Sequence, residues 1–200
     1  MNKENKNYKI NIFIKLHHFL RKLIFPTTQL ISLIPSDSCI LDLGCGNGFV
    51  FRNIKNYKSY LGIDINSKKI QKLNIIKKTS SSYFLAGDIT KKLSKSMFNK
   101  VDKILLIDVV HHVKKYKQLI FLKKILKYAK KKTIFIIKDI DKNKLITSKW
   151  NLIHDLIINW CFISYFDFEK MKKIKGFVII KEFTIRKILY DHYFLILKKI

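Results

Sequence analysis

The chain has 200 residues, 48% of them hydrophobic, which suffices for one domain with a sizeable core and argues against disorder. Its three cysteines form no CxxC pair, so neither a zinc site nor a disulfide framework is predicted, and a reducing cytoplasm is favoured. Lys and Arg total 41 against 14 Asp and Glu, and the resulting net charge of +27 attracts nucleic acid or anionic membranes.

The positive charge comes almost entirely from lysine, since arginine stands only at Arg21, Arg52 and Arg186. Proteins that read phosphates and bases favour arginine for its bidentate fork. The chain is also rich in Ile and Asn, which share A/T-rich codons with Lys. We therefore favour a compositional bias that spreads lysine over any solvated face, and we keep a dedicated polyanion site as the alternative.

The first 35 residues are predicted to form a helical extension packed on a single domain that spans residues 1–200. Apolar residues recur at helical spacing over Ile10–Ile24, and Pro26 ends that helix. A second short helix is predicted over Thr28–Ile34. The first helix is basic on its other side and is able to contact a membrane surface, although packing on the domain is favoured. No apolar run reaches the length of a membrane span, and no signal peptide is recognised, so a cytoplasmic location is expected.

From residue 38 onward, short apolar runs alternate with helical patterns, which is typical of βαβ units and a parallel sheet. Two further β-rich runs are expected to form a closing antiparallel hairpin. The predicted fold is a Rossmann-like α/β three-layer sandwich with a mostly parallel seven-stranded sheet. The predicted strands are Ser38–Leu43, Tyr60–Asp64, Tyr83–Asp88, Lys103–Asp108, Thr133–Asp139, Phe177–Phe183 and Tyr193–Leu197, and the predicted helices are Gly48–Lys55, Ser67–Lys78, Lys92–Phe98, Lys114–Ala129 and Ser148–Trp160.

Acidic residues are rare in this chain, yet one falls at or near the end of each of the first five predicted strands. In open α/β sheets, ligands bind outside the carboxyl ends of the strands. Helix capping by aspartate is the structural alternative, but it explains one or two positions better than a row of them. The residues are Asp42, Asp64, Asp88, Asp108 and Asp139.

A glycine-rich loop follows the first of these strands and opens a helix. It contains Gly44, Cys45, Gly46 and Gly48, and its amides are candidates to hold an anionic group. A dinucleotide fingerprint needs its third glycine at position 49, where this chain has Phe49. The G-x-G-x-G pattern therefore argues against a pyrophosphate clamp of the NAD type.

Residues 36–140 resemble the class I S-adenosylmethionine-dependent methyltransferases, specifically their small-molecule and quinone-type branch. Four motifs stand in the family's order. They are Asp42–Gly48, the run Tyr60–Asp64, the run Ala86–Ile89, and Ile107–Val113 with its paired histidines. The cofactor implied by the resemblance is S-adenosylmethionine.

The resemblance also implies a role for each motif. The loop from Asp42 to Gly48 would cradle the methionine end of the cofactor, with Cys45 lining it. Asp64 would accept the ribose hydroxyls and Asp88 the adenine amine, and the fourth motif, with Asp108 and Val109, would lie beside the methyl group. Ile65 and Ile89 would sandwich the adenine ring, although both also suit ordinary strand ends in the core.

Candidate residues on the acceptor side are His111, His112, Asp139 and His154. An imidazole beside the methyl group would serve as a base or a substrate anchor, and Asp139 would orient a substrate or a histidine. Helix capping and packing remain equally good explanations of these residues. No cluster has the sequence spacing of metal ligands, so no metal is predicted.

The methyl acceptor is predicted to be a small molecule or a lipid, since the signature of amino-methylating nucleic-acid enzymes is absent. An RNA methyltransferase that uses the lysine-rich surface is the main alternative. A non-catalytic accessory protein is a third, which the intact Asp42, Gly44, Gly46 and Asp64 argue against. No obligate protein partner is evident.

Overall fold

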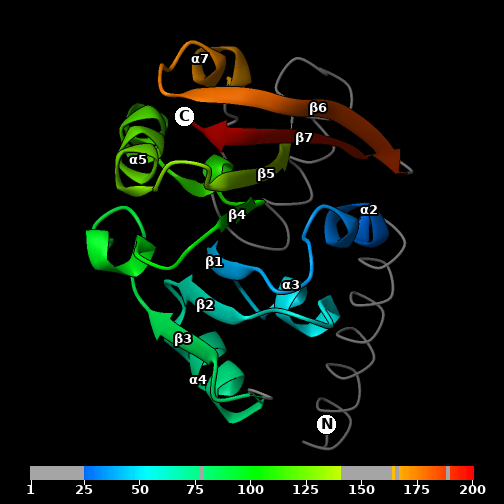
Figure 1. Ribbon diagram of the computed structural model, residues 1–200, viewed down its shortest axis with the longest axis vertical. Coiled ribbons are helices and arrows are strands. Elements are labelled where there is room, and N and C mark those ends of the chain that lie inside the picture. The colour runs from blue at the N-terminus through cyan, green and yellow to red at the C-terminus, as the bar shows by residue number, and fades with distance from the viewer. Residues whose placement is uncertain (1–24, 77–78, 141–163, 165–166, 188–189) are drawn as a thin grey trace, which may run out of the picture.

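The computed structural model describes residues 25–76, 79–140, 164, 167–187 and 190–200. A seven-stranded sheet with the order β3-β2-β1-β4-β5-β7-β6 crosses the molecule (Figure 1). This confirms the predicted mostly parallel sheet and its antiparallel end. The strands are β1 (Cys39–Leu43), β2 (Ser59–Asp64), β3 (Ser82–Ala86), β4 (Lys103–Ile107), β5 (Ile134–Ile140), β6 (Phe177–Lys187) and β7 (Tyr190–Lys199).

Strands β1 to β5 are parallel, and the strand order reverses at β1: β2 and β3 lie on one side of it, and β4 and β5 lie on the other. β1 pairs with β2 on one side and with β4 on the other. The carboxyl ends of β1 and β4 stand at this reversal, which is the position where open α/β sheets bind ligands. The loops that follow β1 and β4 therefore lie side by side, although one follows Leu43 and the other follows Ile107 in the sequence.

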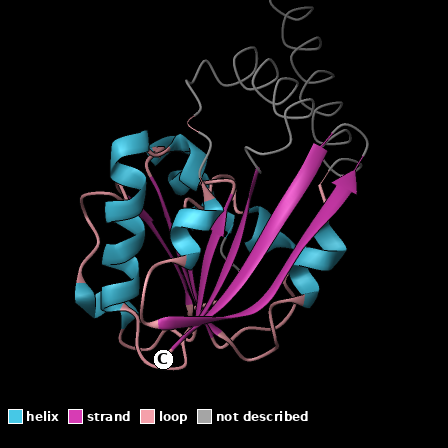
Figure 2. Ribbon diagram, turned by 90° about the horizontal axis from the view of Figure 1, so that it is seen from above, coloured by secondary structure: helices cyan, strands magenta, loops and turns pink. Residues whose placement is uncertain are grey.

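Helices cover both faces of the sheet (Figure 2). One face packs against α2 (Thr27–Ser32), α3 (Phe49–Asn53) and α4 (Ser67–Ile76). The other packs against the 3₁₀ turn η1 (Lys95–Phe98), α5 (Lys115–Tyr128) and α7 (Phe168–Lys172). Strand residues alternate between two apolar clusters, because successive side chains of a strand point to opposite faces. Burial on both faces explains why the central strands are continuously apolar.

The closing hairpin is longer than its apolar pattern predicts. β6 and β7 pair from Phe177 with Lys199 to Lys187 with Tyr190, with one register shift between Ile179 and Lys181. The predicted strands stop where the apolar residues stop, whereas backbone pairing continues through Arg186 and Lys187 on the exposed edge strand. Side-chain pattern alone does not record how far a solvated edge remains paired.

Two predicted strands end earlier than expected, and each ends before its aspartate. β3 ends at Ala86, and Asp88 lies beyond it, where its carboxylate accepts hydrogen bonds from the amide and hydroxyl of Thr90. β4 ends at Ile107 because Asp108 takes a left-handed backbone conformation with φ 56°. The helix predicted over Lys92–Phe98 is only the short turn η1, and the predicted helices at Ile10–Ile24 and Ser148–Trp160 lie outside the described residues.

Among the residues that the structure describes, no helix has the length and apolar content needed to cross a membrane.

Candidate functional site

The loop between β1 and α3 is a tight bend that depends on glycine. Gly44, Gly46 and Gly48 have φ values of 81°, 56° and 73°, a region that L-residues with a side chain rarely adopt. A Cβ on Gly44 would lie 2.5 Å from Cγ2 of Val109, whereas a Cβ on Gly46 would meet nothing within 4 Å. Gly44 therefore lets the loop pack directly on the turn that follows β4, and Gly46 leaves an open space.

Asp64, at the end of β2, is bound to this loop. Its Oδ2 accepts a hydrogen bond from the amide of Gly46 at 2.8 Å, and its Oδ1 accepts one from the amide of Asn66 at 2.8 Å. Each carboxylate oxygen has a second lone pair, so Asp64 retains acceptor capacity toward a ligand. The predicted neighbours Asp64 and Gly46 thus come together in space.

The loop amides themselves are used within the fold. Gly44 and Cys45 donate to the carbonyl of Ile63, and Gly48 donates to the carbonyl of Cys45. The expectation that these amides hold an anionic group is therefore wrong for these three residues. The loop contributes a close backbone approach instead.

Asp42 differs from the other aspartates because its side chain lies in the core. It is 2% exposed and accepts a hydrogen bond from the hydroxyl of Tyr60, which stands on the neighbouring strand β2. Burial raises the pKa of Asp42 to about 7, with the charge of Asp64 adding to the rise and the Tyr60 hydroxyl opposing it. The structure places Asp42 beneath the loop, as a support for it.

Cys45 is also buried, and its sulfur occupies space that a glycine leaves open. A Cβ on Gly62 would lie 3.0 Å from Sγ of Cys45 and 2.7 Å from the ring of Phe84. Burial, together with the carboxylates of Asp42 and Asp64, raises the pKa of the Cys45 thiol. Cys45 therefore acts as a small neutral residue in the wall of the loop.

Asp88 and the two isoleucines flank the β2 and β3 ends of the site. The hydrogen bonds from the Thr90 hydroxyl and amide lower the pKa of Asp88 against the effect of burial, so it is a carboxylate. Ile65 is 74% exposed, whereas Ile89 is partly buried against the core on the α5 side. An exposed isoleucine next to Asp64 suits contact with a flat ligand, and Ile89 serves the core as well.

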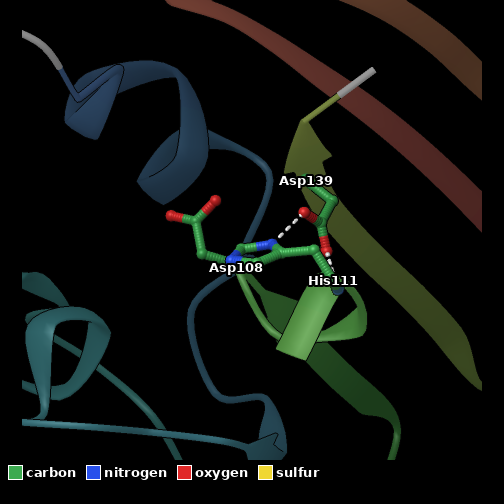
Figure 3. A group of neighbouring side chains, drawn as sticks. All are labelled: Asp108, His111 and Asp139. Atoms are coloured by element: carbon green, nitrogen blue, oxygen red, sulfur yellow. Dashed lines mark hydrogen bonds and ion pairs between the residues drawn. The ribbon is translucent and has the colours of Figure 1, made fainter. Parts of the chain in front are cut away.

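The turn η2 (Val110–His112) carries a histidine that is bound to Asp139 of β5 (Figure 3). The ring Nδ1 of His111 shares a short hydrogen bond with Oδ1 of Asp139, and Oδ2 accepts from the amides of Val110 and His111. Both side chains are buried, at 3% and 1% exposure. The carboxylate of Asp139 thus holds the turn through one oxygen and orients the imidazole ring of His111 through the other.

A second charged pair, which the sequence reasoning missed, lies beside this one. Nζ of Lys138 donates to Oδ1 of Asp108 at 2.5 Å, and Lys138 is 2% exposed. Burial favours the protonated form of Asp108, but the Lys138 ammonium outweighs burial and lowers the pKa of Asp108 to about 2. A lysine among apolar strand residues was the available signal, because a buried ammonium requires a charged partner.

Three of these residues have the chemistry of metal ligands. Ligand atoms of Asp108, His111 and Asp139 lie within 4.8 Å of one another, although their sequence spacing predicts no site. However, the carboxylate of Asp108 already binds the Lys138 ammonium, and that of Asp139 already binds the His111 ring. These contacts suit proton transfer and charge compensation better than a cation.

Of the remaining acceptor-side candidates, His112 lies against the ring of His111 but on the exposed side. His112 is exposed, and its ring centroid lies 4.1 Å from that of His111. His154 lies outside the described residues.

Comparison with protein families identifies a methyltransferase domain over residues 34–177, which is more than half of the chain. No curated protein sequence matches. Solved structures match across nearly the whole chain, at identities that establish the fold alone.

The methyltransferase solved with the Trm112 activator of Haloferax volcanii is 12% identical, covers 86% of this chain and 88% of its own, and has a TM-score of 0.69. The N-methyltransferase NodS from Bradyrhizobium japonicum, solved with S-adenosyl-L-homocysteine, is 12% identical over 86% and 83% of the two chains, with a TM-score of 0.66. Magnesium protoporphyrin IX methyltransferase from Synechocystis, also solved with S-adenosyl-L-homocysteine, is 16% identical. The match covers 100% of this chain and 89% of that chain, with a TM-score of 0.60.

The glycine bend, the acids at the strand ends and the family match agree with one another. The chain belongs to the class I S-adenosylmethionine-dependent methyltransferases.

Proposed function

We propose that this enzyme methylates a small-molecule or lipid-like acceptor whose nucleophilic atom carries a proton. The observation that supports the proposal is the buried pair of His111 and Asp139, held beside the turn that packs on the glycine loop. A positioned base is required only where the acceptor must lose a proton.

The chain's own residues fit the cofactor of the family. Asp64 keeps lone pairs for two ribose hydroxyls, and the space that a Cβ on Gly46 would enter is open. Asp88 is an ionised acceptor suited to an adenine amine. When bound, S-adenosylmethionine supplies an activated methyl group.

The orientation of His111 defines its proposed role. Because Nδ1 is bound to Asp139, the tautomer that donates from Nδ1 leaves Nε2 as the basic nitrogen of the ring. We assign Nε2 as the atom that takes the acceptor's proton, with Asp139 stabilising the imidazolium that results. Burial of both groups excludes water and strengthens that stabilisation.

The distribution of lysine supports this acceptor class over RNA. Exposed lysines occur at the amino ends of strands, as at Lys100 and Lys130–Lys132, and at the carboxyl ends, as at Lys68 and Lys91. A scatter over both ends is what compositional bias produces, whereas a dedicated RNA site would gather lysines at the carboxyl ends.

Transfer of a labelled methyl group to a cell extract, sorted into lipid, small-molecule and RNA fractions, tests the acceptor class. We expect label in the lipid or small-molecule fraction. Label confined to RNA would contradict the proposal.

His111→Ala and Asp139→Asn test the catalytic pair. We expect the first to lower kcat by at least about 100-fold and to leave the Kd for S-adenosylmethionine within about threefold, as removal of a general base does. His112→Ala is the matched comparison, and its effect on kcat is expected to be smaller because Asp139 orients only the His111 ring. A loss of cofactor affinity that matches the loss of kcat would instead place His111 in the cofactor site.

A further inference from the structure

Lys138 is the lysine that the structure buries most deeply among the residues it describes. It lies in β5 between Ile137 and Asp139, and it is 2% exposed. An ammonium group in such surroundings is strongly unfavourable unless a carboxylate compensates it. The buried ammonium of Lys138 therefore requires specific partners that compensate its charge.

Two groups hold that charge. The ammonium donates to Oδ1 of Asp108 at 2.5 Å, and it lies 4.7 Å from the centre of the Phe25 ring. The backbone ties the same two residues together, because the amide of Asp108 donates to the carbonyl of Lys138 at 2.8 Å. Lys138 and Asp108 thus form one rigid unit at the carboxyl ends of β4 and β5.

The two side chains of this unit differ in their exposure to solvent. The side chain of Asp108 is 28% exposed, whereas that of Lys138 is 2% exposed. Val109, the next residue after Asp108, is the one that would clash with a Cβ on Gly44. The carboxylate of Asp108 is therefore partly exposed beside the residue that packs on the glycine loop, whereas the ammonium of Lys138 is buried.

We propose that Lys138 controls the enzyme's discrimination between the cationic S-adenosylmethionine and the neutral product S-adenosyl-L-homocysteine, by cancelling the charge of Asp108. The inference rests on the donor assigned under the proposed function. The sulfonium loses its positive charge during methyl transfer. An uncompensated carboxylate at this edge would stabilise the charged donor more than the transition state, and tighter binding of the ground state alone slows the chemical step.

The other charged groups around Asp108 do not replace Lys138. The other titratable groups that face Asp108 are His111 of η2, His192 of β7 and Asp139 of β5, which brings a second negative charge to the cluster. The low pKa of Asp108 agrees with its assignment as a carboxylate. Removal of the lysine charge would leave the two carboxylates without an ammonium group to balance them.

Calorimetric titration with S-adenosylmethionine and with S-adenosyl-L-homocysteine tests this inference. The quantity measured is the ratio of the two affinities, in the wild type, Lys138→Met and the double variant Lys138→Met, Asp108→Asn. At about pH 8 we expect Lys138→Met to raise the preference for the cationic donor by about tenfold, which is about 1.4 kcal/mol. The double variant should return the ratio to within about threefold of wild type, since both charges are gone.

The pH dependence adds a readout that a merely structural lysine would not move. Without the ammonium, burial raises the pKa of Asp108. The preference for the cation in Lys138→Met should therefore fall as pH is lowered, while the wild-type ratio stays constant over the same range.

Lys103 provides the matched control, because it pairs with Asp102 at 3.3 Å at the opposite end of β4. Lys103→Met should leave the ratio unchanged, and Lys138→Arg, which keeps the charge, should keep the wild-type ratio. If Lys138→Met does not fold, Asp108→Asn replaces it, and its uncompensated ammonium should lower the ratio.

An unchanged ratio in folded Lys138→Met or Asp108→Asn would overturn the role of Lys138 alone. Failure of the wild type to bind either molecule would overturn the donor assignment and this inference with it.

Discussion

At the scale of single residues, five aspartates that look alike in the sequence have different surroundings in the structure. Burial raises the pKa of Asp42 to about 7, whereas the Lys138 ammonium outweighs burial and lowers the pKa of Asp108 to about 2. Asp64 binds the glycine loop, and Asp139 binds a histidine. The sequence predicted their common edge of the sheet and a histidine as one candidate partner of Asp139. It did not predict the partners of Asp42 and Asp108, because these stand on other strands.

Asp42 yields a prediction about pH. Its folded pKa of about 7 lies above the ordinary value of about 3.9, so between these values the folded chain keeps a proton that the unfolded chain releases. Stability should therefore fall as pH rises through this window. We expect the unfolding free energy of the wild type, relative to Asp42→Asn, to drop by on the order of 2 kcal/mol between about pH 5 and about pH 8. Urea unfolding measures it, and a constant difference would contradict the assignment.

The glycines of the loop yield a second prediction. Gly46→Ala incurs only the backbone strain of φ 56°, because its Cβ enters open space, and we expect a loss of about 1–2 kcal/mol in stability. The same Cβ should weaken S-adenosylmethionine binding by more than tenfold, because it fills the cradle. Gly44→Ala adds the clash with Val109 and should destabilise the fold further.

Gly176→Ala is the control, since its φ of 100° gives strain in the turn before β6. It should lower stability without affecting cofactor affinity. Unchanged affinity in Gly46→Ala would show that the open space is not the cofactor's.

At the scale of elements, periodicity and glycine placement predicted all seven strands. Among the helices of the described residues they predicted α2, α3, α4 and α5, whereas α7 was not predicted. The errors lie where local sequence is silent. The edge strand β6 remains paired to Lys187 beyond its apolar run, and the region after β3 forms only a short 3₁₀ turn. The link from His111 to Asp139 joins residues 28 positions apart, so only the parallel pairing of β4 with β5 brings them together. The pair of Lys138 and Asp108 also joins β5 to the end of β4, so a lysine among apolar residues signals a charged partner without identifying it.

Gln118 of α5 connects its helix to the turn η2 and to Ser164. Its Nε2 donates to the carbonyl of Val110 at 3.0 Å and to that of Ser164 at 2.5 Å, and its side chain is buried. Gln118→Leu leaves both carbonyls without this donor, and we expect it to cost about 1–3 kcal/mol in stability. It should also lower kcat, because Val110 and His111 share the turn η2.

Gln71→Leu on the exposed face of α4 is the matched control for urea unfolding and turnover, and little change is expected there. Equal effects of the two substitutions would contradict the role of Gln118 in holding η2.

At the scale of the whole molecule, the net charge is +27, and the described part of the chain has exposed lysines at both ends of the sheet. Like charges at this density repel one another, and this repulsion destabilises the compact state. Salt screens it, since the Debye length falls to about 10 Å at 0.1 M. The charge thus affects stability and solubility more than it defines a site.

The melting temperature should therefore rise when NaCl is increased from about 0.05 M to about 0.3 M. Scanning calorimetry measures this directly, with an uncharged osmolyte of equal osmolality as the control. A melting temperature that falls with salt would indicate that specific ion pairs, rather than repulsion, dominate the electrostatics.

The central claim is that Asp64 and the glycine bend hold an adenosyl donor, and titration of the wild type and Asp64→Ala with S-adenosylmethionine tests it most directly. Removal of the exposed Glu169 of α7 by Glu169→Ala controls for the loss of one negative charge. We predict micromolar binding by the wild type and by Glu169→Ala, and binding at least about tenfold weaker, about 1.4 kcal/mol, by folded Asp64→Ala. Equal affinity in all three proteins would contradict the site described for this chain.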